Sequence, residues 1–79
     1  MGKPGDKPAM TEFGRRVRAR RMELGLSQMA LADRAGLDFT YVSSVERGRR
    51  NLTLTSILRL ALALEVDPGE LLRGAHLTN

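Results

Sequence analysis

The side chains best equipped to hold an anion lie together in the middle of the sequence. They are Arg47, Arg49, Arg50 and Asn51. The planar guanidinium group of arginine presents paired N–H donors that fit phosphate oxygens or the acceptor edge of guanine. A run of cations is also common on an ordinary solvated surface, so the elements around this run decide between the two interpretations.

Catalytic and metal-binding patterns do not accompany this run. The chain has no Cys and a single His, His76 near the C-terminus, which excludes thiolate metal sites and the usual catalytic triads. It also lacks paired carboxylates, a Gly-rich phosphate loop and a nucleophile elbow. We therefore expect no enzyme activity, no metal and no cofactor, and the lack of Cys fits a reducing cytoplasm.

Length and charge narrow the class of protein further. The 79 residues allow one domain with one small core. The formal net charge is +4, and residues 1–52 hold 11 basic and 6 acidic side chains, while the rest holds 2 and 3. This asymmetry predicts that the first part faces a polyanion such as nucleic acid, and that the remainder serves packing and self-association. The longest apolar stretch is too short to span a membrane.

Helix start and stop residues divide the chain from Thr11 onward into short segments, and no alternating strand pattern appears. The expected N-caps are Thr11, Ser27, Asp38, Thr53 and Asp67. Glu70 would complete a capping box at the last helix. The predicted helices cover residues 12–24, 28–35, 39–47, 54–64 and 68–73. The expected fold is all-α, with a flexible arm over residues 1–10, a domain over residues 11–74 and a tail over residues 75–79.

The second and third predicted helices have the features of a helix-turn-helix. Both are short, and Gly36 opens the turn between them. The third helix turns Val42 and Val45 inward and keeps a polar outer face. In such a pair the first helix braces the second across the major groove of DNA, where base edges present distinguishable donors, acceptors and thymine methyl groups.

Residues 12–72 resemble the lambda-repressor-like (Xre-type) helix-turn-helix transcriptional regulators. The matching stretches are RRVRARRMELGLSQMALADRAGL, SSVERG and LTSILRLALALEVDPGELL. The run LDFTYVSSVERGRRNLT is similar to the controller proteins of restriction-modification systems. The resemblance implies a five-helix DNA-binding domain that acts on transcription.

The resemblance also implies which residues meet DNA. Base contacts fall on the outer face of the third helix, namely on Phe39, Thr40, Tyr41 and Ser44. They also fall on Arg50, in the segment that follows this helix. Phosphate contacts fall at the start of the second helix and after the third, namely on Ser27, Gln28, Arg47, Arg49 and Asn51. Free amides and the helix dipole attract a phosphate at a helix N-terminus, although Ser27 is equally a plain N-cap. Ser43 is expected to point inward or to support the turn.

Two residues depart from the pattern of the relatives. Controllers and phage repressors usually carry Arg or Gln where this chain has Phe39. The ring of Phe39 can pack on a thymine methyl group or against a neighbouring helix, and both interpretations stay open. Many relatives carry Leu where this chain has Arg20, whose stem we expect to lie along the surface with its charge in water.

Glu46 is an acidic residue in an otherwise basic segment. The resemblance pairs it with Arg21. This ion pair would tie the first helix to the third and fix how the third helix is presented, and removal of either partner would leave a partly buried charge.

The last two helices carry more apolar side chains than one small core needs. We therefore predict a homodimer interface formed by Leu64, Val66, Leu71 and Leu72. The alternative is that these side chains close the core of a single subunit.

The sequence thus predicts a cytoplasmic regulator that binds double-stranded operator DNA as a homodimer. It would act by occupying promoter elements or by contacting RNA polymerase, and we expect no membrane interaction. An alternative from a different class is an antitoxin-type protein, which inhibits a partner protein and autoregulates its operon.

Overall fold

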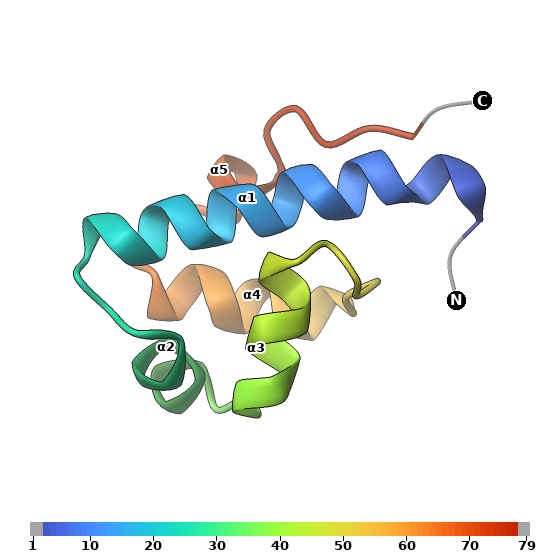
Figure 1. Ribbon diagram of the computed structural model, residues 1–79. Coiled ribbons are helices and arrows are strands. Elements are labelled where there is room, and N and C mark those ends of the chain that lie inside the picture. The colour runs from blue at the N-terminus through green and yellow to red at the C-terminus, as the bar shows by residue number, and fades with distance from the viewer. Residues whose placement is uncertain (1–2, 78–79) are drawn as a thin grey trace.

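The computed structural model describes residues 3–77, and within that range it contains helices and no strands (Figure 1). A short 3-10 helix, η1 (Pro4–Asp6), leads into the long helix α1 (Lys7–Glu23). The shorter helices are α2 (Gln28–Ala35), α3 (Phe39–Glu46), α4 (Leu54–Ala63) and α5 (Pro68–Leu72). The prediction of an all-α fold with five α-helices is confirmed.

Helix α1 spans one side of the molecule and organises the rest (Figure 1). It contacts α3 and α5, while α4 contacts α2 and α5, and α2 contacts α3. In Figure 1, α2 and α3 project together below α1, and α5 and the C-terminal segment lie above it. None of the helices within residues 3–77 has the length and apolar character that a membrane crossing requires.

Short polar side chains fix three of the helix starts. Ser27 Oγ accepts the N–H of Ala30 at 3.0 Å at the start of α2. Thr53 Oγ1 accepts the N–H of Ser56 at 3.1 Å at the start of α4, and Asp67 Oδ2 accepts that of Gly69 at 2.9 Å at the start of α5. Each contact satisfies an N–H group that has no partner within its own helix.

The predicted start of the first helix was wrong. Helix α1 begins at Lys7, so Thr11 lies inside the helix and is not its N-cap. The physical reason is Pro8, which lies in the first turn, where its missing N–H removes no helical hydrogen bond. Residues 7–10 of the predicted flexible arm are therefore helical, while residues 1–2 lie outside the described part of the chain.

Two further caps differ from the predictions. Asp38 occupies the N-cap position of α3, but its side chain accepts no capping hydrogen bond. Glu70 forms an ion pair with Arg73 at 2.5 Å, one turn along α5, and this replaces the predicted capping box. Asp38 and Glu70 are both exposed, so each carboxylate can be hydrated or paired without a capping hydrogen bond.

All five α-helices contribute to one apolar core. Its fully buried members are Val17, Leu31, Val42, Val45, Leu60, Leu64 and Leu71. Val42 and Val45 come from α3, as predicted, and they fix which side of that helix faces inward. The opposite side of α3 must therefore face outward.

Helix α1 approaches the end of α3 so closely that only glycine fits at the crossing. A Cβ added at Gly14 would lie well inside van der Waals distance of the backbone carbonyl oxygen of Val45 and 3.0 Å from that of Glu46. Gly14 is buried in the middle of α1, where glycine weakens a helix by about 1 kcal/mol relative to alanine. The close approach of two backbones explains why glycine stands there.

We predict that Gly14→Ala lowers the free energy of unfolding by about 1–3 kcal/mol, because the added methyl group forces α1 away from α3. Chemical denaturation measures the change. Helix propensity alone predicts the opposite sign. The matched control is the exposed Ala19→Gly on the same helix, which should be destabilising by about 1 kcal/mol through propensity only. Stabilisation by Gly14→Ala would contradict the observed approach.

Candidate nucleic-acid interface

Helices α2 and α3 are joined by a tight turn that lets them pack against each other. Gly36 ends α2 with a φ of 68°, in the left-handed region that glycine adopts without strain. Leu31 and Ala32 of α2 and Val42 of α3 are buried beneath the turn. Helices α2 and α3 therefore pack as one unit, and the N-terminal end of α3 lies away from the core.

The outward face of α3 is open at its N-terminal end. Phe39 is 43% exposed, and Thr40 beside it is also exposed. An exposed ring at this position is free to contact an external group, such as a thymine methyl group in the major groove. The exposure of Phe39 disfavours its alternative role as a packing residue between helices.

Tyr41 and Ser44 lie on a side of α3 that the chain itself covers. After Gly48 the backbone reverses, and the N–H of Arg49 donates to the carbonyl oxygen of Ser44 at 3.0 Å. The guanidinium carbon of Arg50 then lies 5.1 Å from the centre of the Tyr41 ring, a cation–π distance. Tyr41 is half-buried, so Arg50 and Tyr41 form one stacked unit at the edge of α3.

The predicted orientation of one of the two serines of α3 was wrong. Ser44, expected to face bases, is buried at 9% exposure. Ser43, expected to point inward or to support the turn, is half-buried, and its Oγ accepts a hydrogen bond from Arg47 Nη1 at 3.2 Å. Helical spacing alone places both serines equally far from the Val42–Val45 face, and the reversal at Gly48 decides between them.

The arginines that follow α3 remain available to an external anion. Arg47, Arg49 and Arg50 are exposed, and so is Asn51. Within residues 3–77, no carboxylate lies within ion-pair distance of any of these three guanidinium groups. Ser27, at the start of α2, is also exposed, although its hydroxyl oxygen already caps the helix.

The carboxylate of Glu46 joins the three helices behind this surface. It accepts Arg21 Nε at 2.6 Å and Arg21 Nη2 at 2.9 Å, and its side chain is only 2% exposed. Arg21 Nη1 donates to the carbonyl oxygen of Leu26 at 2.8 Å. The hydrogen bond with Glu46 raises the pKa of the Arg21 guanidinium, against the opposite effect of burial, so Arg21 stays cationic.

Gln28 belongs to the same network, which the sequence did not reveal. Its Nε2 donates to Glu46 Oε1 at 3.0 Å. A glutamine amide has two N–H donors, and the contact with Glu46 uses one of them. The contact links the first residue of α2 to the end of α3, and it fixes the position of both helices.

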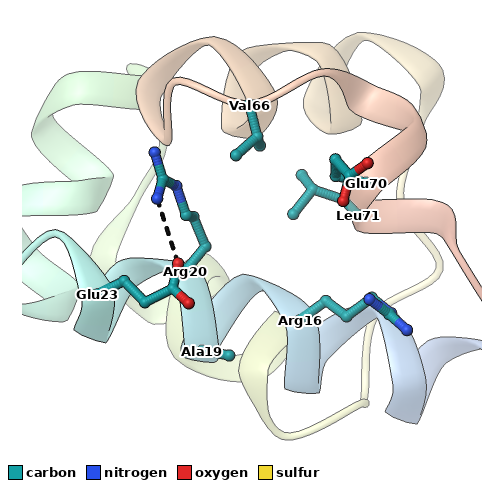
Figure 2. A pocket seen from close by; sticks show the side chains of 7 residues that line it. All are labelled: Arg16, Ala19, Arg20, Glu23, Val66, Glu70 and Leu71. Carbon is teal, nitrogen blue, oxygen red and sulfur yellow. Dashed lines mark hydrogen bonds and ion pairs between the residues drawn. The ribbon is translucent and has the colours of Figure 1, made fainter.

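A second arginine on α1 stabilises the far end of α4. Arg20 Nε donates to the carbonyl oxygen of Leu64 at 2.9 Å, and Arg20 Nη1 to Glu23 at 3.2 Å. Figure 2 shows Arg20 and Glu23 at a hollow of about 270 Å³ between α1 and the α4–α5 segment. The charge of Arg20, expected in water, is only partly exposed, because the last carbonyl groups of a helix attract a cation.

The predicted dimer residues do not form one surface. Leu64 and Leu71 are in the core, at 0% and 2% exposure, because α4 and α5 turn them towards the other helices. Val66 is half-buried, and Leu72 is exposed. Three exposed apolar side chains follow one another at four-residue spacing along α4, namely Leu54, Leu58 and Leu62.

The fold and the open α3 face together define a helix-turn-helix DNA-binding domain. A family model described as helix-turn-helix matches residues 17–71. The control protein C.BamHI of Bacillus amyloliquefaciens is 43% identical over 61 residues, which cover 76% of this chain and 75% of that protein.

Solved structures agree with this assignment. The restriction-modification controller C.AhdI of Aeromonas hydrophila is 52% identical, with a TM-score of 0.77 over 78% of this chain and 94% of that one. The C.Esp1396I tetramer in complex with its natural 35 base-pair operator is 33% identical, with a TM-score of 0.74 over 80% and 83% of the two chains. The chain belongs to the lambda-repressor-like (Xre-type) helix-turn-helix regulators, and its relatives include restriction-modification controller proteins.

We predict that Arg21 and Glu46 are strongly coupled. Arg21→Met alone should lower the free energy of unfolding by about 3 kcal/mol, because it leaves the buried carboxylate of Glu46 without its cation. In a double-mutant cycle with Glu46→Leu, the combined loss should be smaller than the sum of the single losses.

The matched control is the exposed pair Arg34–Glu65, whose side chains are 46% and 64% exposed. A double-mutant cycle on this pair should give a coupling energy of less than about 1 kcal/mol. Equal coupling energies for the two pairs would contradict the structural role of Glu46.

Proposed function

We propose that this protein is a sequence-specific transcriptional regulator that binds double-stranded operator DNA as a homodimer. The observation that carries the proposal is the outward face of α3, where Phe39 and Thr40 are exposed. The helix is followed by three arginines that have no acidic partner within residues 3–77. A short helix of this kind fits the major groove, where base edges can be read.

Thr40 and Phe39 are the proposed base readers. A threonine can donate to or accept from base edges, and its methyl group, like the Phe39 ring, can contact a thymine methyl group. Arg50 lies at the edge of the same face, with its guanidinium carbon over the Tyr41 ring, 5.1 Å from the ring centre. Such stacking limits the rotamers of Arg50 before DNA arrives, so less entropy is lost when it binds. Ser44 is withdrawn from this set because it is buried.

Phosphate contacts are proposed on the two sides of α3. On one side lies the start of α2, whose free backbone N–H groups attract an anion, together with Gln28, whose amide has a second N–H donor. On the other side lie Arg47, Arg49 and Asn51. Such contacts set the register of α3 in the groove without reading sequence.

Self-association is proposed through the exposed apolar stripe on α4. Leu54, Leu58 and Leu62 are 71%, 45% and 83% exposed, and Leu72 of α5 borders a shallow apolar hollow beside Ile57. A two-fold pair would bury the same stripe twice. The operator complex of C.Esp1396I, a tetramer, supports assembly of this fold on DNA.

We predict that base reading and phosphate contact separate experimentally. Thr40→Ala should cost about 1–3 kcal/mol per half-site on the operator and leave non-specific binding unchanged. Arg49→Ala should weaken all duplexes alike and reduce the salt slope by about 0.9 per contact in each subunit. Titrations of a selected operator and a scrambled duplex at several salt concentrations measure both. Loss of sequence preference in Arg49→Ala, with equal weakening of both duplexes in Thr40→Ala, would reverse the assignment.

We further predict that Leu62→Glu and Leu54→Glu each dissociate the dimer, because a charge on the stripe cannot be buried without a partner. Sedimentation equilibrium measures the effect. Both side chains are highly exposed, so each subunit should remain folded by circular dichroism. The control is Met22→Glu, an equal change at a 58% exposed position on α1. A wild-type monomer would refute the homodimer and favour the antitoxin-type alternative, in which another protein covers α4.

A further inference from the structure

The basic residues of this chain fall into two groups, those that form an ion pair with a glutamate and those that do not. The arginines paired with glutamate are Arg15, Arg16, Arg20, Arg21, Arg34 and Arg73. Within residues 3–77, the basic side chains outside any ion pair are Lys3, Lys7, Arg18, Arg47, Arg49, Arg50 and Arg59. Three of these border the proposed DNA face. Lys7 and Arg18 are the two on α1, and nothing in the proposed function uses them.

Lys7 and Arg18 share one face of α1. They are eleven residues apart, or about three helical turns, so their side chains leave the helix in nearly the same direction about 16 Å apart. Thr11 lies between them on this face, one turn after Lys7. Both basic side chains are exposed.

This face of α1 borders the segment that follows α3. A Cβ added at Gly48 would lie 2.9 Å from both Cα and Oγ1 of Thr11, so Thr11 touches the backbone between Arg47 and Arg49. Gly14, one turn before Arg18, touches the carbonyl groups of Val45 and Glu46. Lys7 and Arg18 therefore extend the basic surface of residues 47–50 along α1 in both directions.

Two acidic residues near the middle of this face, Glu46 and Glu12, are directed elsewhere. Glu46 is buried against Arg21 and Gln28. Glu12 pairs with Arg15 and Arg16. Its carboxylate lies towards the chain after α5, where a Cβ added at Gly74 would be 3.8 Å from Glu12 Oε2. Like charges left together without a counterion repel one another in the free protein, and a polyanion relieves this repulsion.

We propose that the Lys7–Arg18 face of α1 is a second contact with the DNA backbone, adjoining the α3 interface and adding phosphate contacts that carry no base recognition. The proposal rests on the DNA binding proposed above. In this proposal α1 contacts DNA directly, in addition to packing against α3. Its partner is the phosphate backbone of the same duplex that α3 reads.

The test compares two variants that each remove one positive charge. One charge lies on the Lys7–Arg18 face of α1, and the other lies at the end of α5. Arg18→Gln removes a proposed phosphate contact, and the control Arg73→Gln removes an equal charge beside the Glu12–Arg16 side. Arg18→Lys retains the charge. Binding of each protein to a duplex selected from a random pool, and to a scrambled duplex of equal length, is titrated across a range of salt concentrations.

Arg18→Gln should reduce the salt slope by about 0.9 in each subunit, which corresponds to about a fivefold loss of affinity per subunit at 0.15 M salt. The loss should be the same for both duplexes, because a phosphate contact carries no sequence preference. Lys7→Gln added to Arg18→Gln should roughly double the change in slope, and Arg18→Lys should restore most of it. An unchanged melting temperature would show that Arg18→Gln is folded.

Equal slopes for Arg18→Gln and Arg73→Gln would overturn the proposal and leave the DNA binding by α3 intact. A wild-type protein that binds both duplexes without preference would instead refute the proposed regulator function, whatever the slopes of the variants. A wild-type protein that binds neither duplex would overturn both proposals.

Discussion

One buried carboxylate holds the geometry of this domain together. Glu46, at the end of α3, receives hydrogen bonds from Arg21 of α1 and Gln28 of α2, and Arg21 also binds the carbonyl oxygen of Leu26 between them. A charge this deeply buried is tolerated only when it is paired and fully hydrogen-bonded. The three helices therefore cannot move independently without exposing an uncompensated charge. This constraint gives α3 one fixed orientation, which base recognition requires because a displaced helix would misplace every donor.

The same constraint shapes the charge of the surface. Because Glu46 is withdrawn into the interior, the segment after α3 presents cations alone, and the glutamates of α1 and α5 neutralise arginines on the other side of the molecule. Three cations, Arg47, Arg49 and Arg50, are therefore exposed directly after α3. Gly14 belongs to this arrangement as well, since the contact between α1 and α3 brings Arg21 within reach of Glu46. The close crossing of α1 and α3 therefore accounts both for the burial of Glu46 against Arg21 and for the lack of an acidic side chain in the segment after α3.

Local sequence features predicted the helices well, because caps and glycines act over a few residues. Ser27, Thr53 and Asp67 cap the helices where expected. The positions of Ser44 and Leu64 were mispredicted, because their environment depends on segments distant from their own helical turn. Ser44 is 9% exposed in a helix whose C-terminal end bonds to the backbone beyond Gly48, and Leu64 is fully buried at the end of α4, which packs on α2 and α5. Gly14 was the one available signal of the close crossing, as a glycine between Phe13 and Val17 in the middle of a helix.

The most direct test of the account is the change in backbone amide NMR shifts of 15N-labelled protein titrated with a selected operator duplex. The account predicts large changes at the start of α2, along α3 from Phe39 to Ser43, in residues 47–51 and on the Lys7–Arg18 face of α1. The amides of the α1–α5 hollow around Arg16 and Glu70 should change little. Changes concentrated in α5 and that hollow, with α3 unaffected, would contradict the claim that the α2–turn–α3 unit is the DNA-binding surface.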